Sequence, residues 1–113
     1  MFQKSLEIGY LLDFYGELLN ERRRTVLYMY YNEDMSLSEI AESLGITRQG
    51  ARDLIKKAGD ELLLFEEKLR MAKKFRDLCE CADSAENIIR SSSTDNSGKL
   101  LNILSEIRQI IEN

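Results

Sequence analysis

SLSEIAESLGITRQG, residues 36–50, carries the local signals of two helices joined by a tight turn. Ser36 and Glu39 are spaced as a capping box, in which each side chain accepts a hydrogen bond from the other residue's backbone amide. Gly45 can adopt the left-handed conformation that ends a helix, and Thr47 can cap the next helix. The stretch therefore predicts a helix of about eight residues, a glycine turn and a second helix.

The apolar residues around this turn fit a helix-turn-helix. Ala41 is small at the point where the two helices cross closely. The residues that fill the space between the helices are Ile40, Leu44, Ile46 and Leu54. In DNA-binding proteins such a pair exposes its second helix, so that the early residues of that helix reach base edges in the major groove. The outward positions here are Thr47, Arg48, Gln49, Arg52, Asp53 and Lys56.

Most of these side chains suit contact with a duplex. Arg48 or Arg52 can pair with guanine through two hydrogen bonds, and Gln49 can pair with adenine. Thr47, Lys56 and Lys57 can hold phosphates. Lys57 adjoins the outward positions in the sequence. The sequence thus predicts a nucleic-acid-binding site formed by Thr47, Arg48, Gln49, Arg52, Lys56 and Lys57.

Charge makes this a small local patch on an acidic chain. The chain has 16 basic and 20 acidic residues and a net charge of -4, whereas residues 48–57 hold four basic residues and one acidic residue. So small a patch binds weakly at physiological salt unless a dimer doubles it. A solvated helix face is the alternative interpretation of the same residues. A second basic cluster, Arg22 to Arg24, begins a helix where cations are disfavoured, and it too can be a solvated face or contact phosphate.

Outward from the turn the pattern is helical throughout, and the 113 residues include no proline. Apolar residues recur at helical spacing over residues 6–19, and Asn20 can cap a further helix that reaches about Tyr31. After Thr47 the stripe continues to Ala82, which predicts one very long helix, with Gly59 as the place for any break. A polar loop over residues 91–98 precedes an apolar terminal helix over residues 100–111.

Composition argues against an enzyme and against bound cofactors or metals. The chain has no histidine, which removes the commonest general base and most metal sites. The two cysteines, Cys79 and Cys81, point to different faces of a helix and fit idle thiols in a reducing cytoplasm. Neither a secretory signal nor a membrane-spanning run is present. We therefore expect a cytoplasmic protein without membrane insertion.

The segment LLDFYGELLNERRRTVLYMYYNEDMSLSEIAESLGITRQGARDLIKKAGDELLLFEEKL, from Leu11 to Leu69, resembles the YlxM family of Firmicutes and related bacteria. The motifs that carry the resemblance are DFYGELL, YYNEDMSLSEIAESLGITRQ and IKK. The helical hairpin is also similar to the fourth conserved region of sigma factors, which reads the promoter −35 element. The resemblance implies an all-helical, DNA-binding or regulatory protein. It also implies a link to the signal recognition particle pathway, because family genes lie beside those of its GTPases.

The resemblance places Thr47, Arg48, Gln49, Arg52 and Lys56 at the positions that would face DNA. Arg48 and Gln49 match the start of the family's SRQ motif, with Thr47 in place of the usual serine cap. The chain departs from the family at residues 50–51, Gly-Ala, where alanine and a β-branched residue are more usual. This departure trims the packing between the helices. Beyond about residue 75 the resemblance says little.

Together these observations predict an all-α fold: a sigma-region-four-like helix-turn-helix core with a long C-terminal helical extension. We expect a helix-turn-helix domain over residues 1–70, followed over residues 71–113 by the extension and the C-terminal helix, which serve homodimerisation. Packing within one chain is the alternative for these helices. Two functions compete: a DNA-binding regulator, and an interaction module that modulates the signal recognition particle machinery without sequence-specific DNA binding.

Overall fold

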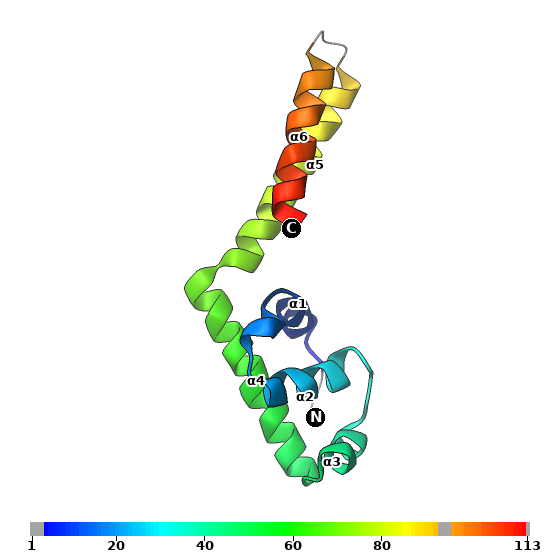
Figure 1. Cartoon of the computed structure of the whole chain (residues 1–113), viewed down its shortest axis with the longest axis vertical. Coiled ribbons are helices and arrows are strands. Elements are labelled where there is room, and N and C mark those ends of the chain that lie inside the picture. The colour runs from blue at the N-terminus through cyan, green and yellow to red at the C-terminus, as the bar shows by residue number, and fades with distance from the viewer. Residues whose placement is uncertain (1–3, 93–95, 113) are drawn as a thin grey trace. The chain divides into compact units, whose positions relative to one another are not determined.

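The computed structural model describes residues 4–92 and 96–112, and all the regular structure in these ranges is helical (Figure 1). The chain forms two compact units, Met1–Arg70 and Met71–Asn113. The elements of the first unit are α1 (Leu6–Tyr15), the short 3-10 helix η1 (Gly16–Leu18), α2 (Glu21–Tyr31), α3 (Leu37–Leu44) and α4 (Arg48–Leu69). The second unit contains α5 (Met71–Ser91) and α6 (Ser97–Glu112). The predicted all-α class is confirmed.

The capping box that begins α3 is present. The Ser36 hydroxyl oxygen accepts a hydrogen bond from the Glu39 amide at 3.1 Å, and the Glu39 carboxylate accepts one from the Ser36 amide at 2.9 Å. These two hydrogen bonds favour the charged carboxylate, so they lower the pKa of Glu39 below its ordinary value. The start of α3 is therefore determined by four consecutive residues.

The turn between α3 and α4 depends on Gly45, whose φ of 68° lies in the left-handed region. The Ile46 amide donates to the Ala41 carbonyl at 3.0 Å, and the Gly45 amide donates to the Glu42 carbonyl at 3.3 Å. This pair of hydrogen bonds is a Schellman motif, which satisfies carbonyls that the end of a helix leaves open. The predicted glycine turn is confirmed.

Helix α4 is the element on which the first unit is built, and α1, α2 and α3 all pack along it (Figure 1). Its buried apolar side chains recur every three or four positions: Ala51, Ile55, Ala58 and Leu62. The other helices bury complementary side chains, among them Leu11, Leu12, Val26, Leu27 and Ile40. This core fixes how α4 is rotated about its own axis.

Two polar contacts also connect α1 to its neighbours. The buried Tyr15 donates its hydroxyl hydrogen to the Glu66 carboxylate of α4 at 2.6 Å. At the other end of α1, the Ser5 amide donates to the Tyr31 hydroxyl at 3.3 Å. The aromatic residues of the N-terminal third thus contribute hydrogen bonds as well as apolar surface.

The prediction of one helix from Thr47 to Ala82 is wrong. Helix α4 ends at Leu69, and Arg70 adopts a left-handed conformation with φ 54° before α5 begins. Gly59, the expected place for a break, lies inside α4 and is buried beside Ile8 of α1. Apolar periodicity misses the break because it records which residues need burial and not which surface buries them. Here the stripe changes partners, from α1–α3 to α6.

The second unit is a hairpin in which α5 and α6 pack side by side (Figure 1). Arg108 of α6 donates to Asp83 at 2.6 Å and to Glu86 at 2.8 Å, both on α5. Hydrogen bonds from Arg90 first, and then from Arg108, lower the pKa of Glu86 below its ordinary value. The buried residues of α5 are Ala72 and Ala82, and no described residue of α6 is buried.

The loop predicted over residues 91–98 is shorter than expected at both ends. Ser91 still belongs to α5, and Ser97 already begins α6. Residues 93–95 lie outside the described residues. Within the described ranges, the structure contains no helix long and apolar enough to cross a bilayer.

We predict that Gly45→Ala lowers the free energy of unfolding of the first unit by about 1–2 kcal/mol, since a Cβ atom is strained in the left-handed conformation. No heavy atom lies within 4 Å of the added Cβ, so backbone strain is the whole effect. The control is Gly9→Ala within α1, where the Cβ makes an ordinary 3.5 Å contact with Tyr31. This control should be neutral or stabilising by up to about 1 kcal/mol. Equal destabilisation of both variants in denaturant unfolding would contradict the prediction.

Candidate nucleic-acid interface

Thr47 forms the N-cap of α4, and several residues in the first turns of this helix are solvent-exposed. The Thr47 hydroxyl oxygen accepts a hydrogen bond from the Gly50 amide at 2.9 Å. All six predicted site residues are exposed: Thr47, Arg48, Gln49, Arg52, Lys56 and Lys57. Exposure leaves their side chains accessible to a ligand, whatever its class.

The helix places five of these residues together and separates the sixth. Each residue turns an α-helix by about 100°, so Arg48, Gln49, Arg52 and Lys56 lie within about 100° of one another, next to the Thr47 cap. Lys57 lies about 180° from Arg48 around the helix. The predicted site is therefore one outward face, which we define as residues 47, 48, 49, 52 and 56, plus a lysine on its flank.

Acidic neighbours engage part of this outward face. The Gln49 side-chain amide donates to the Asp53 carboxylate at 2.8 Å, one turn along the helix. Lys56 pairs with Asp60 in the same way at 3.3 Å, with both side chains more than half exposed. Exposed pairs of this kind are weak, at about 0.3–0.5 kcal/mol, so a stronger ligand can displace them.

The basic cluster of α2 divides into residues with different contacts. Arg23 forms an ion pair with Glu61 of α4 at 2.7 Å, with both side chains about one-third exposed. This arginine therefore connects α2 to α4. Arg22 is exposed and lies beside the helix-turn-helix. The sequence predicts the cluster but cannot tell which arginine faces which surface, because that depends on the rotation of α2.

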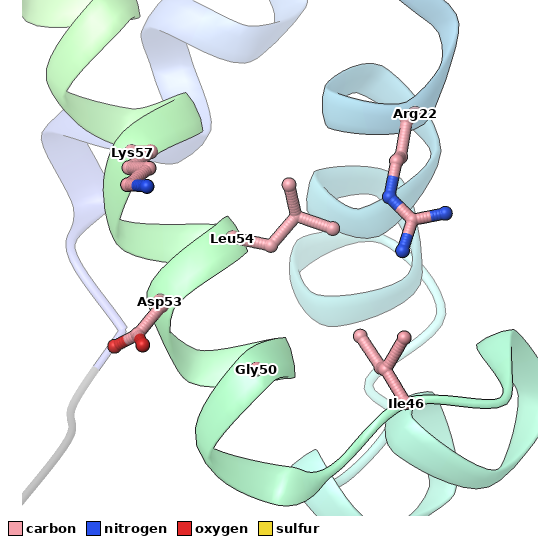
Figure 2. A pocket seen from close by; sticks show the side chains of 6 residues that line it. All are labelled: Arg22, Ile46, Gly50, Asp53, Leu54 and Lys57. Atoms are coloured by element: carbon pink, nitrogen blue, oxygen red, sulfur yellow. The ribbon is translucent and has the colours of Figure 1, made fainter.

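A hollow of about 220 Å³ lies between α2 and the start of α4 (Figure 2). Ile46, Gly50 and Leu54 provide its apolar part, and Figure 2 shows the Leu54 side chain directed from α4 toward α2. The charged residues that line it are Arg22, Asp53 and Lys57. Ile46 and Leu54 are only half-buried, although the sequence predicts that they fill the space between the helices. Gly50 adds no side chain to fill this space, whereas the family that the sequence resembles more often has alanine at this position.

Metal-ligating side chains are not clustered in the part of the chain that the structure describes. Among the residues described, no three histidine, cysteine or acidic side chains are placed to hold a metal ion. Cys79 is half-buried and Cys81 is exposed, and both are free thiols. The geometry offers a charged surface on a helix rather than an enclosed chemical centre.

The fold and the exposed second helix define a protein of the helix-turn-helix class. Residues 2–102 match the model of a family described as "UPF0122: Putative helix-turn-helix protein, YlxM / p13 like". The chain belongs to this family. That description is of a helix-turn-helix protein and not of an enzyme family.

Individual relatives show the same membership. The chain is 41% identical to a UPF0122 protein of Thermoanaerobacter sp. (strain X514), over 90% of this chain and 88% of the relative. It is 36% identical to a UPF0122 protein of Clostridium kluyveri, over 88% and 89% of the two chains. A Clostridium perfringens UPF0122 protein is 46% identical over 64% of each chain.

We predict that Arg23 and Glu61 are energetically coupled in stability. A double-mutant cycle of Arg23→Ala and Glu61→Ala should give a coupling of about 0.5–1 kcal/mol, since the pair is partly shielded from water. Chemical denaturation of the four proteins measures it. The cycle Arg22→Ala with Glu61→Ala is the control and should give a coupling near zero. Coupling of equal size in both cycles would contradict the division of the arginine cluster.

Proposed function

We propose that this protein is a DNA-binding regulator that uses the start of α4 to contact a duplex. The observation that carries the proposal is the outward face, where Arg48, Gln49 and Arg52 are exposed at the start of a helix that is held in place by its buried stripe. Arginine and glutamine are side chains that distinguish guanine and adenine in the major groove. The proposal places the protein in the cytoplasm, where bacterial DNA lies.

The remaining predicted residues serve the phosphate backbone in this proposal. Lys56 gives up its pair with Asp60 for a phosphate, and Lys57 adds a charge beside the outward face. The Thr47 hydroxyl accepts from the Gly50 amide and still has its hydrogen to donate. Contacts to phosphate position the helix and carry no sequence information by themselves.

The second candidate is an interaction module for the signal recognition particle machinery, the pathway to which the family resemblance points. Two observations favour it: the net charge of -4, and the engagement of Gln49 and Lys56 by acidic neighbours. In this alternative, Arg48, Arg52 and Lys56 meet an acidic protein surface or the RNA of the particle.

We predict that the full chain binds mixed-sequence duplex DNA at micromolar concentration and low salt, and that binding weakens as salt rises. Arg48→Ala combined with Arg52→Ala should abolish this binding, because the pair supplies half of the positive charge in residues 48–57. Fluorescence anisotropy of labelled duplex at two salt concentrations measures it. The control variant is Arg24→Ala with Lys68→Ala, which removes two charges away from the outward face.

The possible outcomes separate the two candidates. Loss of binding in the outward-face variant alone supports DNA recognition by α4. If the control variant loses as much duplex affinity, the loss is due to the change in net charge and not to the position of Arg48 and Arg52. No binding by the unmodified protein at low salt removes the DNA proposal and leaves the interaction module.

We also propose that the second unit forms a homodimer. Its two helices leave large apolar side chains exposed: Leu78, Ile88, Leu100, Ile103, Ile107 and Ile110. Ile110 is 78% exposed and Ile103 is 53% exposed, on a helix with no fully buried residue among those described. A second hairpin would cover such surface and would double the small basic patch that reaches DNA.

We predict that Ile103→Glu combined with Ile110→Glu converts the dimer to a monomer, since two charges cannot be buried unpaired in an apolar contact. Sedimentation equilibrium of the full chain measures the mass. The matched control is Asn102→Glu with Gln109→Glu, which adds the same charges at the same spacing on a neighbouring side of α6 and should stay dimeric. A monomeric unmodified protein at micromolar concentration would contradict the dimer.

A further inference from the structure

The hollow between α2 and α4 brings together two basic residues that lie 35 positions apart in the sequence. Arg22 reaches it from the first turn of α2, and Lys57 reaches it from the third turn of α4 (Figure 2). Ile46 and Leu54 give it an apolar floor. The surface is therefore concave, apolar at its centre and positive on two sides.

Neither of these cations is engaged by an acidic residue. Within residues 4–92 and 96–112, Arg22 and Lys57 form no ion pair and no side-chain hydrogen bond. By contrast, Arg23 is paired with Glu61 and Lys56 with Asp60. Arg22 also lies in the first turn of a helix, where a positive charge costs about 0.3–1 kcal/mol without a counter-ion. An anion bound beside Arg22 would remove that cost.

The place of the hollow relative to the outward face identifies the anion. An α-helix with its side chains is about 10–12 Å wide, and the major groove is about 12 Å wide, so a helix in the groove fills it. Its flanks then face the phosphates that line the groove. Lys57 lies on such a flank, about 80° around the helix from Gln49, which forms the nearer edge of the outward face. Arg22 extends this flank onto α2.

We propose that Arg22 and Lys57 together clamp one phosphate of the DNA backbone, with the adjoining deoxyribose packed on Ile46 and Leu54. This inference rests on the proposed function, and it assigns Arg22 of α2 to an interface otherwise built from α4. The apolar floor suits deoxyribose, which lacks the 2′-hydroxyl of RNA. The clamp positions the helix on the duplex and does not select a base sequence.

Asp53 is the one acidic residue that lines the hollow, and it opposes phosphate binding there. Its carboxylate accepts the hydrogen bond from Gln49 at 2.8 Å, and this hydrogen bond partly offsets the negative charge of the carboxylate. Since a carboxylate repels a phosphate, Asp53→Asn should tighten DNA binding while an amide oxygen remains for Gln49. This variant tests the position of the phosphate by a gain of affinity.

The decisive measurement is the dependence of duplex affinity on salt for the full chain. A phosphate neutralised by the protein contributes about 0.9 to the slope of log affinity against log salt. Because one phosphate is shared, Arg22→Ala with Lys57→Ala should lower the slope by about 0.9, and two separate contacts would lower it by about 1.8. The loss should be equal for duplexes of different sequence. Lys68→Ala is the control, on the same helix and away from the hollow, and should leave the slope unchanged.

The outcomes distinguish this inference from the proposed function. If the unmodified protein does not bind duplex DNA, both fall. If it binds and the Arg22/Lys57 double variant keeps the slope, the clamp alone is overturned. A slope lowered by about 1.8 also overturns the clamp, because it indicates two separate phosphate contacts. If the double variant loses as much slope with duplex RNA as with duplex DNA, the deoxyribose has no role and the inference falls as well. Because Arg22 and Lys57 are exposed, their replacement should leave the protein folded, and thermal unfolding of each variant checks this.

Discussion

Burial of the α4 stripe is the constraint on which the first unit depends. Ala51 and Ala58 are fully buried, and their small side chains let other helices approach closely, while Ile55 and Leu62 supply the larger apolar surface. Burying a side chain of the larger kind stabilises a fold by about 1.5–3 kcal/mol. Because α1, α2 and α3 all pack on this stripe, rotation of α4 about its axis would expose it and open the core.

Fixing the rotation of α4 also determines what the helix presents to solvent. Arg48, Gln49 and Arg52 lie on an exposed face because neighbouring positions of the same turns are buried. The Gly45 turn, just before the start of α4, also contributes, since its left-handed conformation sets the direction in which the chain passes from α3 into α4. Core packing and turn geometry thus orient the candidate site, without the site residues contributing to the core.

The second unit solves a different physical problem. Two helices can bury only the surface that they share, and the hairpin leaves isoleucine and leucine side chains exposed along α5 and α6. The Arg108 contacts with Asp83 and Glu86 join the helices through hydrogen-bonded ion pairs. Such pairs contribute little to stability in water compared with apolar burial. They therefore do not compensate for the isoleucine and leucine side chains that this unit leaves exposed.

The sequence by itself determined the features that depend on neighbouring residues. The capping box at Ser36, the Gly45 turn, the Thr47 cap and the helical class all follow from signals within a few positions. The outward face follows as well, because a fixed helical period assigns residues to sides once the buried stripe is recognised. These features involve interactions between groups that are close in the chain, so the local sequence contains the whole cause.

Only the tertiary structure decided the features that depend on which surface a segment meets. The end of α4 at Leu69 reflects a change of packing partner, and an unbroken apolar stripe does not record that change. The different contacts of Arg22 and Arg23 depend on how α2 is rotated against α4, as does the hollow shared by Arg22 and Lys57. Such features join residues far apart in the chain, and their geometry exists only once the helices have packed.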